Sequence, residues 1–219
     1  KIESPGAIGN QSVPPPQAGS KFGPAALEAE RKREKQLELQ REKARALLAE
    51  AGYADGFSFG LKCPNNRYLN DEAVCQAVTG MLAQVGIDAT LEAMPVNNYW
   101  PELRADNFDM YLLGWSPGTF DAEHPIRFLV ATPNEEKKLG SWNFGGFSNA
   151  RIDTLLPMIQ SEIDPAERQA MLDEVAQIMA DEQAYVPLYV QPLVWGTRAN
   201  IELTQRPDNF FILRWVTVN

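Results

Sequence analysis

The sequence predicts an α/β fold, a mixed sheet flanked by helices, and the order of its elements is the first reason. Apolar and polar residues alternate over residues 57–61 and again over 87–93, as in half-buried strands. Between them, residues 71–86 place apolar side chains at helical spacing, and residues 98–104 indicate a further short helix. The apolar run 108–115 then indicates a strand covered on both faces. Strands that alternate with helices in this way imply crossover connections.

Composition limits the class of protein. The chain has 219 residues, of which 44% are hydrophobic and 22% charged, which suits a globular protein with one large domain or two small ones. The formal net charge of −9 argues against a nucleic-acid partner, because phosphate binding needs a basic surface. The longest apolar runs are far too short for a transmembrane segment. The chain opens without a recognisable signal peptide, so we expect a processed chain or a fragment.

The N-terminal part combines an extended segment and a charged helix. Residues 1–23 are rich in Pro, Gly and Ser, which predicts an irregular lead-in or connector. Residues 25–51 consist almost entirely of good helix formers, and Gly52 is a plausible stop. Pairs such as Glu28 with Lys32 are spaced for contact on one helix face. The charges favour a solvated helix, and an interaction protein that uses residues 25–51 as a partner helix is an alternative.

The C-terminal half reads as loops, two helices and short strands. Asn149 is placed to open one helix, which contains Pro157. Asp164 is followed by Pro and then by Glu167, a strong signal for the start of another helix. Residues 116–148 are rich in loops, with a short helix expected over residues 125–131. Three strand-like segments follow, over residues 185–190, 193–201 and 210–218.

Cys63 and Cys75 are the only cysteines, twelve positions apart. This spacing is not that of a zinc knuckle or a redox motif, and one histidine is too few to complete a usual structural zinc site. The two cysteines are either reduced core residues or one disulfide, which would imply an oxidising compartment.

The pentapeptide GWSPG, residues 114–118, matches the G-x-S-x-G pattern of serine hydrolases, and Asp121 and His124 follow it. Pro117 lacks the backbone N–H that the residue after the nucleophile supplies to an oxyanion hole. A relay of Ser116, His124 and Asp121 would also have to form within one short loop, whereas such residues normally come from separate elements. We therefore expect no catalytic residue, no metal and no cofactor, with a hydrolase using Ser116 as an alternative.

Several segments in a fixed order resemble one family. They are residues 44–57 (ARALLAEAGYADGF), 63–88, 108–115 (FDMYLLGW), 145–156 (GGFSNARIDTLL) and 186–189 (VPLY), followed by WGTRANI and RPDNFF. Together they resemble the C-terminal part of the bacterial extracellular solute-binding proteins of the peptide/nickel class, the binding components of ABC importers. The helix over residues 25–43 is longer than is usual in that family.

The resemblance implies a lobe of a class II periplasmic binding protein-like fold. It implies a lead-in over residues 1–23, an α/β lobe over 24–200, and a terminal segment 201–219 that crosses back to a first lobe which this chain lacks. It also implies export to the periplasm and an ABC transporter membrane permease as partner. Export in turn favours the Cys63–Cys75 disulfide.

The same resemblance implies where a ligand would bind. The family's Gly-Trp at the end of a strand lines the cleft, and Trp115 matches it. Peptide binders carry an acid three residues later, where this chain has Gly118, so direct capture of a ligand's ammonium group is not expected.

We expect an aromatic wall at Trp115 with polar edges from Ser116 and Asp121. Trp142 and Asn143 are further candidate ligand contacts, although a loop-packing role is equally consistent, and His124 is expected to be structural. The expected function is capture of a small solute, a peptide or peptide-like compound, in a cleft between two lobes.

Overall fold

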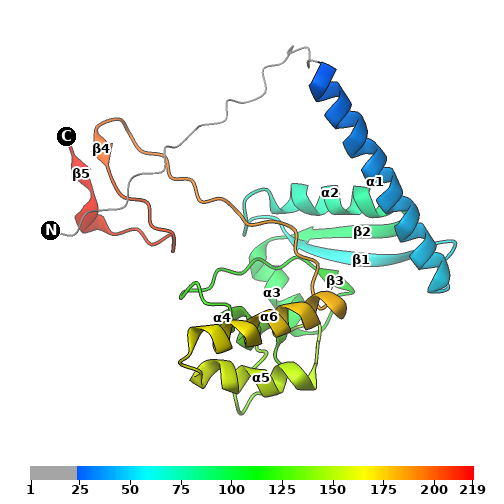
Figure 1. Ribbon diagram of the computed structural model, residues 1–219. Helices are drawn as coiled ribbons and strands as arrows, with labels where there is room; N and C mark the ends of the chain where they lie inside the picture. Colours follow the sequence, from blue (N-terminus) through cyan, green and yellow to red (C-terminus); the bar gives the residue numbers. More distant parts are fainter. Residues whose placement is uncertain (1–23) are drawn as a thin grey trace. The chain divides into compact units, whose positions relative to one another are not determined.

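The computed structural model describes residues 24–219, and these form two compact units. Of the described residues, one unit holds 24–57 with 82–87, and the other holds 58–81 with 88–219. Figure 1 labels the helices and strands. The predicted lead-in, residues 1–23, lies outside the described residues. The predicted boundary at residue 200 stays a prediction.

The first unit is dominated by helix α1, Pro24–Glu50, which confirms the helix expected over residues 25–51. Lys32 and Glu28 form the expected ion pair at 2.9 Å, and both side chains are exposed, so the pair adds little stability. Gly52 follows two residues after the end of the helix, and its φ of +90° is the left-handed conformation that glycine adopts readily. Further on, a Cβ at Gly56 would lie 1.8 Å from the carbonyl oxygen of Gly86, so this approach of two backbones requires glycine.

The second unit contains the sheet, in the order β2-β1-β3. Its strands are β1, Phe57–Pro64, β2, Ile87–Met94, and β3, Met110–Tyr111, of which β1 and β3 run parallel. The strand predicted over residues 108–115 is shorter in the structure, because only Met110 and Tyr111 pair as a ladder with β1. The α/β class with flanking helices is confirmed.

Helices α2, Asp71–Ala83, and α3, Val96–Arg104, flank the sheet. Successive side chains of a strand point to opposite faces, and β1 shows this alternation. Leu61 and Cys63 pack with Cys75 of α2 in one buried cluster. Lys62, between them, instead binds Glu102 of α3 at 3.0 Å and Glu92 of β2 at 2.9 Å. The sheet therefore has an apolar contact with α2 and a charged contact with α3.

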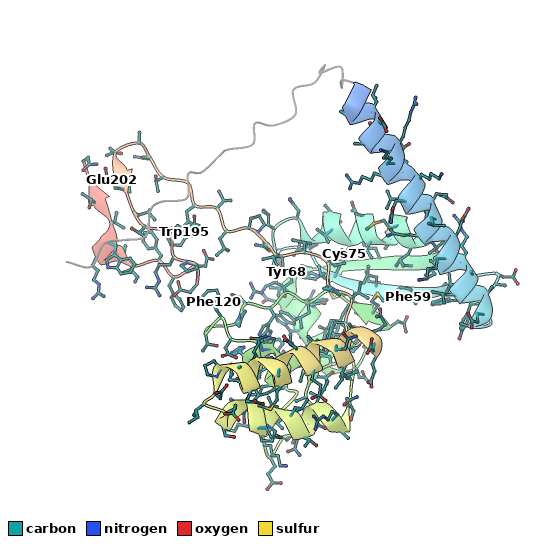
Figure 2. The ribbon with its side chains drawn as sticks, viewed as in Figure 1. Phe59, Tyr68, Cys75, Phe120, Trp195 and Glu202 are labelled. Carbon is teal, nitrogen blue, oxygen red and sulfur yellow. A yellow bond between two sulfur atoms is a disulfide. The ribbon has the colours of Figure 1, made fainter. Side chains whose placement is uncertain are left out.

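Cys63 and Cys75 form a disulfide, which confirms that expectation. Their Cα atoms are 6.5 Å apart, and neither residue is more than 1% exposed. The bond joins the carboxyl half of β1 to α2 (Figure 2, where Cys75 is labelled). It thus fixes the end of the strand from which the next loop starts.

A helical subregion of the second unit has its own core. It consists of α4, Glu123–Pro125, the π-helix η1, Ile126–Val130, α5, Ala150–Ser161, and α6, Pro165–Asp181. Asn149 and Asp164 cap α5 and α6 as predicted, each accepting two backbone N–H bonds. The buried core of this subregion comprises Ile126, Val130, Ala131, Ile152, Leu155, Leu156, Ile159 and Val175.

The C-terminal segment contains less regular structure than the sequence predicts. Only β4, Ile201–Glu202, and β5, Thr217–Val218, pair, in antiparallel fashion, with the 3-10 helix η2, Leu213–Trp215, before β5. The strand predicted over residues 185–190 is wrong, and of the one predicted over residues 193–201 only Ile201 lies in a strand, β4. Alternating apolar residues favour a strand, but no described strand pairs with this stretch, and Val190 is 93% exposed.

Candidate functional site

The candidate site lies where the parallel strands β1 and β3 end. Ligands of open α/β sheets bind outside the carboxyl ends of the strands. Here the chain leaves β1 through Arg67 and Tyr68, and it leaves β3 through Gly114 and Trp115. The hydroxyl of Tyr68 donates to the carbonyl oxygen of Gly114 at 3.2 Å, so the two strand exits touch.

Gly114 is required by this contact. A Cβ at position 114 would lie 2.7 Å from Cε1 of the Tyr68 ring. Because real Cβ atoms do not approach a ring so closely, any larger residue would push Tyr68 away. The glycine of the Gly-Trp pair therefore lets an aromatic ring from the β1 exit (Tyr68 is labelled in Figure 2) cover the β3 exit.

Trp115 is the centre of an aromatic cluster. Its indole nitrogen donates a hydrogen bond to Nδ1 of His124 at 3.1 Å. The centroid of its ring system lies 5.5 Å from that of His124, 5.8 Å from that of Phe128 and 5.9 Å from that of Trp142. These distances are typical of tilted and edge-to-face aromatic pairs. We call these four residues the aromatic wall.

Trp142 extends the wall toward α3 and the sheet. Its ring contacts Trp100 edge-on at 5.3 Å and Phe144 at 5.7 Å. Phe144 in turn contacts Tyr111 of β3 at 6.0 Å. Rings from α3, β3, η1 and the loop after η1 therefore form one connected surface, and Trp115 and Trp142, both candidates from the sequence, are brought together in it.

Two arginines add positive charge at this surface. The guanidinium of Arg67 lies 5.2 Å from the ring centroid of Tyr68, and that of Arg104 lies 5.8 Å from the ring of Trp142. Such stacking on an aromatic face is favourable for a guanidinium. Both residues are exposed, and within residues 24–219 neither takes part in an ion pair. Their donor groups are therefore free for a ligand.

Ser116 does not belong to a catalytic relay in the described structure. Its side chain is exposed, and Nδ1 of His124 is occupied by the indole of Trp115. The carboxylate of Asp121 is bound to Arg168 and not to His124. His124 therefore orients the tryptophan, which is the structural role expected of it, and nothing in the described part of the chain favours the hydrolase alternative.

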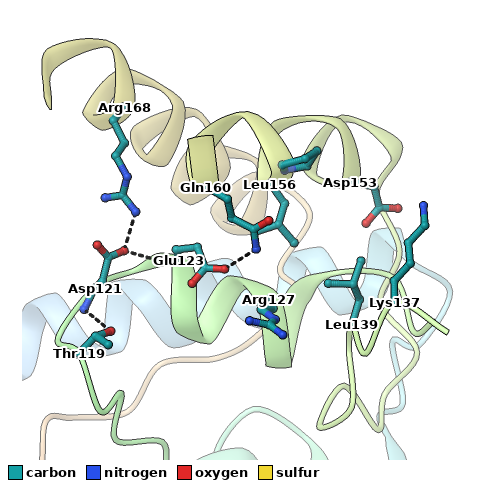
Figure 3. Close-up of a pocket in the computed structure, with 11 residues that line it drawn as sticks. Thr119, Asp121, Glu123, Arg127, Lys137, Leu139, Asp153, Leu156, Gln160 and Arg168 are labelled. Carbon is teal, nitrogen blue, oxygen red and sulfur yellow. Dashed lines mark hydrogen bonds and ion pairs between the residues drawn. The ribbon is translucent and has the colours of Figure 1, made fainter. Parts of the chain in front are cut away.

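Asp121 is held by protein groups. Its carboxylate accepts from Arg168 at 2.9 Å and from the backbone N–H of Glu123 at 2.8 Å. The hydrogen bond from Arg168, and then the one from the Glu123 backbone, hold the pKa of Asp121 below its usual value. The side chain lines a cavity with Arg168 (Figure 3), whose lining includes no residue of the aromatic wall. Ligand binding by Asp121 stays a prediction.

Asn143 is buried, with 4% of its surface exposed. Its amide nitrogen donates to the carbonyl oxygens of Ala131 and Phe147, and its amide oxygen accepts from the backbone N–H of Phe147. These bonds use most of what the amide can form. Asn143 thus shapes the loop that carries Trp142, and its direct contact with a ligand stays a prediction.

The sequence reading missed Arg67, Tyr68, Trp100, Arg104 and Phe128. None of them lies in a motif that signals ligand binding by itself. A usable signal did exist for Tyr68 and Arg67, since they follow directly on a strand that was predicted to be part of a parallel α/β sheet. Phe128 could not be recognised, because only the fold of η1 brings it to Trp115.

The described part of the chain brings together no group of three His, Cys, Asp or Glu side chains that could hold a metal ion. No helix that the structure describes has the length and apolar character needed to cross a membrane.

Comparison with known proteins identifies a family model and a relative that match this chain. Residues 5–136 match the model of the bacterial extracellular solute-binding proteins, family 5 Middle. The glutathione-binding protein GsiB of Escherichia coli K12 is 32% identical over 164 residues, which cover 73% of this chain and 31% of GsiB. The chain therefore spans about a third of the length of this relative.

Solved structures show the same fold. The periplasmic binding protein DppA of Helicobacter pylori, in complex with the peptide STSA, superposes with a TM-score of 0.59 at 24% identity, over 67% of this chain and 28% of DppA. HbpA2 of Haemophilus parasuis gives 0.62 at 19% identity, over 81% of this chain and 35% of HbpA2. This agrees with the expected lobe of a class II periplasmic binding protein. With more than half of its residues matched by the family model, the chain belongs to the bacterial extracellular solute-binding proteins of family 5.

Proposed function

We propose that this chain forms one wall of the solute site in the substrate-binding component of an ABC importer. The observation that carries the proposal is the aromatic wall at the carboxyl end of β3, with Tyr68 and Arg67 at the adjoining end of β1. Binding sites for small molecules combine apolar and aromatic walls with a few placed polar groups. The family match supports the same reading.

The solute is a small peptide or peptide-like compound that carries carboxylate groups. Gly118 stands where the peptide binders resembled by this chain carry an acid for the ligand's ammonium group. Arg67 and Arg104 instead offer guanidinium groups, which bind carboxylates through two parallel hydrogen bonds. A relative is named for binding glutathione, and a solved neighbour of similar fold holds agropinic acid.

Capture requires a second wall. We propose that a first lobe, which the family resemblance implies, closes over the solute bound at Trp115, and that residues 201–219 cross back to that lobe. Closure then follows from tighter binding of the solute to the closed than to the open arrangement. The loaded protein delivers the solute to a membrane permease from the periplasm, a compartment in which the Cys63–Cys75 disulfide persists.

The proposal is tested by titrating the 219-residue chain with glutathione, an Ala–Glu dipeptide and a Lys–Lys dipeptide, followed by the indole N–H resonances in NMR spectra. We expect saturable shifts of Trp115 and Trp142 with the two acidic ligands, with a dissociation constant on the order of 1 mM because only one wall is present. Trp195, which lies outside the wall, is the internal reference.

A matched pair of variants gives the sharper comparison. Arg67→Gln should weaken binding of the acidic ligands about tenfold, since a charge-assisted bond is lost. Arg198→Gln removes an arginine that is likewise exposed and without an ion pair in the described chain, and it should leave binding unchanged. Equal binding of the Lys–Lys dipeptide, or equal effects of the two variants, would contradict the assignment.

A further inference from the structure

The cavity that Asp121 and Arg168 line, of about 680 Å³, lies in the helical subregion. Its lining comes from the segment 119–127, from the loop before Gly140, and from α5 and α6 (Figure 3). None of its lining residues belongs to the aromatic wall. The cavity is therefore a separate site and not an extension of the proposed solute site.

The carboxylates of this cavity are occupied by protein donors. Asp121 is bound to Arg168, as described above. Glu123 accepts a hydrogen bond from the side-chain amide of Gln160 at 2.6 Å. Asp153 accepts from both the backbone N–H and the hydroxyl of Thr132, at 3.0 and 2.5 Å. The acidic groups of the lining thus already have partners within the protein.

Unlike these carboxylates, the two cations Arg127 and Lys137 have no oppositely charged partner within the described residues. Both line the cavity. Arg127 is half-buried, and its guanidinium lies 5.1 Å from the ring centroid of Phe128. A guanidinium carries five N–H donors and an ammonium three. Within the described residues, the hydrogen bonds of Arg127 and Lys137 are made by their backbone atoms and not by these donors. The cavity therefore has cationic hydrogen-bond donors that are available to a ligand with acceptor groups.

The same cavity has an apolar part. Leu139, Leu156 and Pro157 line it together with the two cations. Leu156 is 1% exposed and belongs to the core of the subregion, so this part of the lining is held rigidly. A bare inorganic anion would leave these apolar groups without contact, whereas a short hydrocarbon body would cover them.

We infer that this cavity is a second binding site, which takes a small organic carboxylate through Arg127 and Lys137. The carboxylate accepts hydrogen bonds from the two cations, and its hydrocarbon part packs against Leu139, Leu156 and Pro157. Because η1 carries both Arg127 and Phe128, an occupant of this cavity contacts the helix that also supports the aromatic wall.

The test is an NMR titration of the 219-residue chain with glutarate and, separately, with inorganic phosphate, at constant ionic strength set with chloride. We expect saturable shifts of the side-chain Nε–Hε of Arg127 and of the Leu156 methyl groups with glutarate. Arg127→Gln should weaken glutarate binding about tenfold, and Lys137→Gln should weaken it measurably. Lys138→Gln is the matched control, because Lys138 is the next residue, is exposed and does not line the cavity.

Three results would overturn the inference. Shifts that do not saturate would show that glutarate has no site there. The same affinity in the Lys137→Gln and Lys138→Gln variants would show that charge near the loop, and not the cavity, attracts the anion. Binding of phosphate as tight as that of glutarate would exclude a role for the apolar lining. Since Lys137 is exposed, the comparison at positions 137 and 138 remains valid even if Arg127→Gln fails to fold.

Discussion

The indole nitrogen of Trp115 donates a hydrogen bond to Nδ1 of His124, which lies nine positions further along the chain and 3.1 Å away. The two rings also lie 5.5 Å apart, so the only histidine of the chain both anchors and flanks the tryptophan at the end of β3. A residue that could have served as a catalytic base is instead committed to holding an aromatic side chain. The relationship connects the strand exit to α4.

Removing this anchor should loosen the wall. In a His124→Ala variant, the free energy of unfolding should fall by about 1–3 kcal/mol, because a half-buried indole N–H loses its acceptor. The indole N–H resonance of Trp115 should move toward the position of a solvent-exposed indole, while that of Trp195 stays fixed. An unchanged Trp115 resonance would mean that the bond is absent in solution.

The contact between Gly114 and Tyr68 makes a prediction about packing. Gly114→Ala should destabilise the protein by about 1–3 kcal/mol, because the added Cβ collides with the tyrosine ring. The same substitution in a Tyr68→Ala background should cost far less, and urea unfolding of the four proteins in this double-mutant cycle measures the difference. Gly118→Ala serves as the control, since a Cβ there meets no atom within 4 Å. If the losses in unfolding free energy of the two single variants add up in the double variant, the Tyr68 ring does not pack against position 114.

The disulfide predicts a thiol count and a stability. Protein prepared under oxidising conditions should show no free thiol when denatured without reductant, since Cys63 and Cys75 are the only cysteines. Replacing both by alanine should lower the free energy of unfolding by about 3 kcal/mol on the chain-entropy estimate. Two reactive thiols in the denatured, unreduced chain would rule the bond out.

The pair of Asp121 and Arg168 predicts a pH dependence. Arg168, and then the backbone N–H of Glu123, lower the pKa of Asp121 from its ordinary 3.8. A lowered pKa in the folded state stabilises the protein above the unfolded value, and this contribution is lost as pH falls from about 4 through the lower folded value. Both side chains are partly exposed, so the contribution is below about 1 kcal/mol.

Urea unfolding of the wild type and of Asp121→Asn between pH 7 and pH 2 checks this dependence. Asparagine keeps an acceptor for the Glu123 backbone but has no charge. The wild type should be more stable at pH 7, and the difference should shrink as the carboxylate is protonated. A difference that is constant down to pH 2 would show that the ion pair contributes nothing.

The regular elements of the lobe could be predicted from local patterns. The helix caps at Asn149 and Asp164 depend on side chains that bond to backbone groups two or three residues away, so sequence alone is enough to place them. In the same way, the alternation over residues 57–61 predicts β1, which the structure extends to Pro64. By contrast, the apolar stretch before β4 resembles a strand, but a strand requires a partner that a local pattern does not supply.

The residues of the candidate site also fall into those that the sequence predicts and those that only the tertiary structure reveals. The sequence by itself determined the α/β class, the helix starts at Asn149 and Asp164, and Trp115 and Trp142 as ligand candidates. These follow from periodicity, from capping residues and from the ordered family segments. Only the tertiary structure decided that Tyr68 covers Gly114 and that Asp121 pairs with Arg168, 47 positions away. It also decided that Phe128 faces Trp115. The physical reason is that such contacts depend on how strands and helices pack, and packing joins residues whose separation along the chain carries no periodic signal.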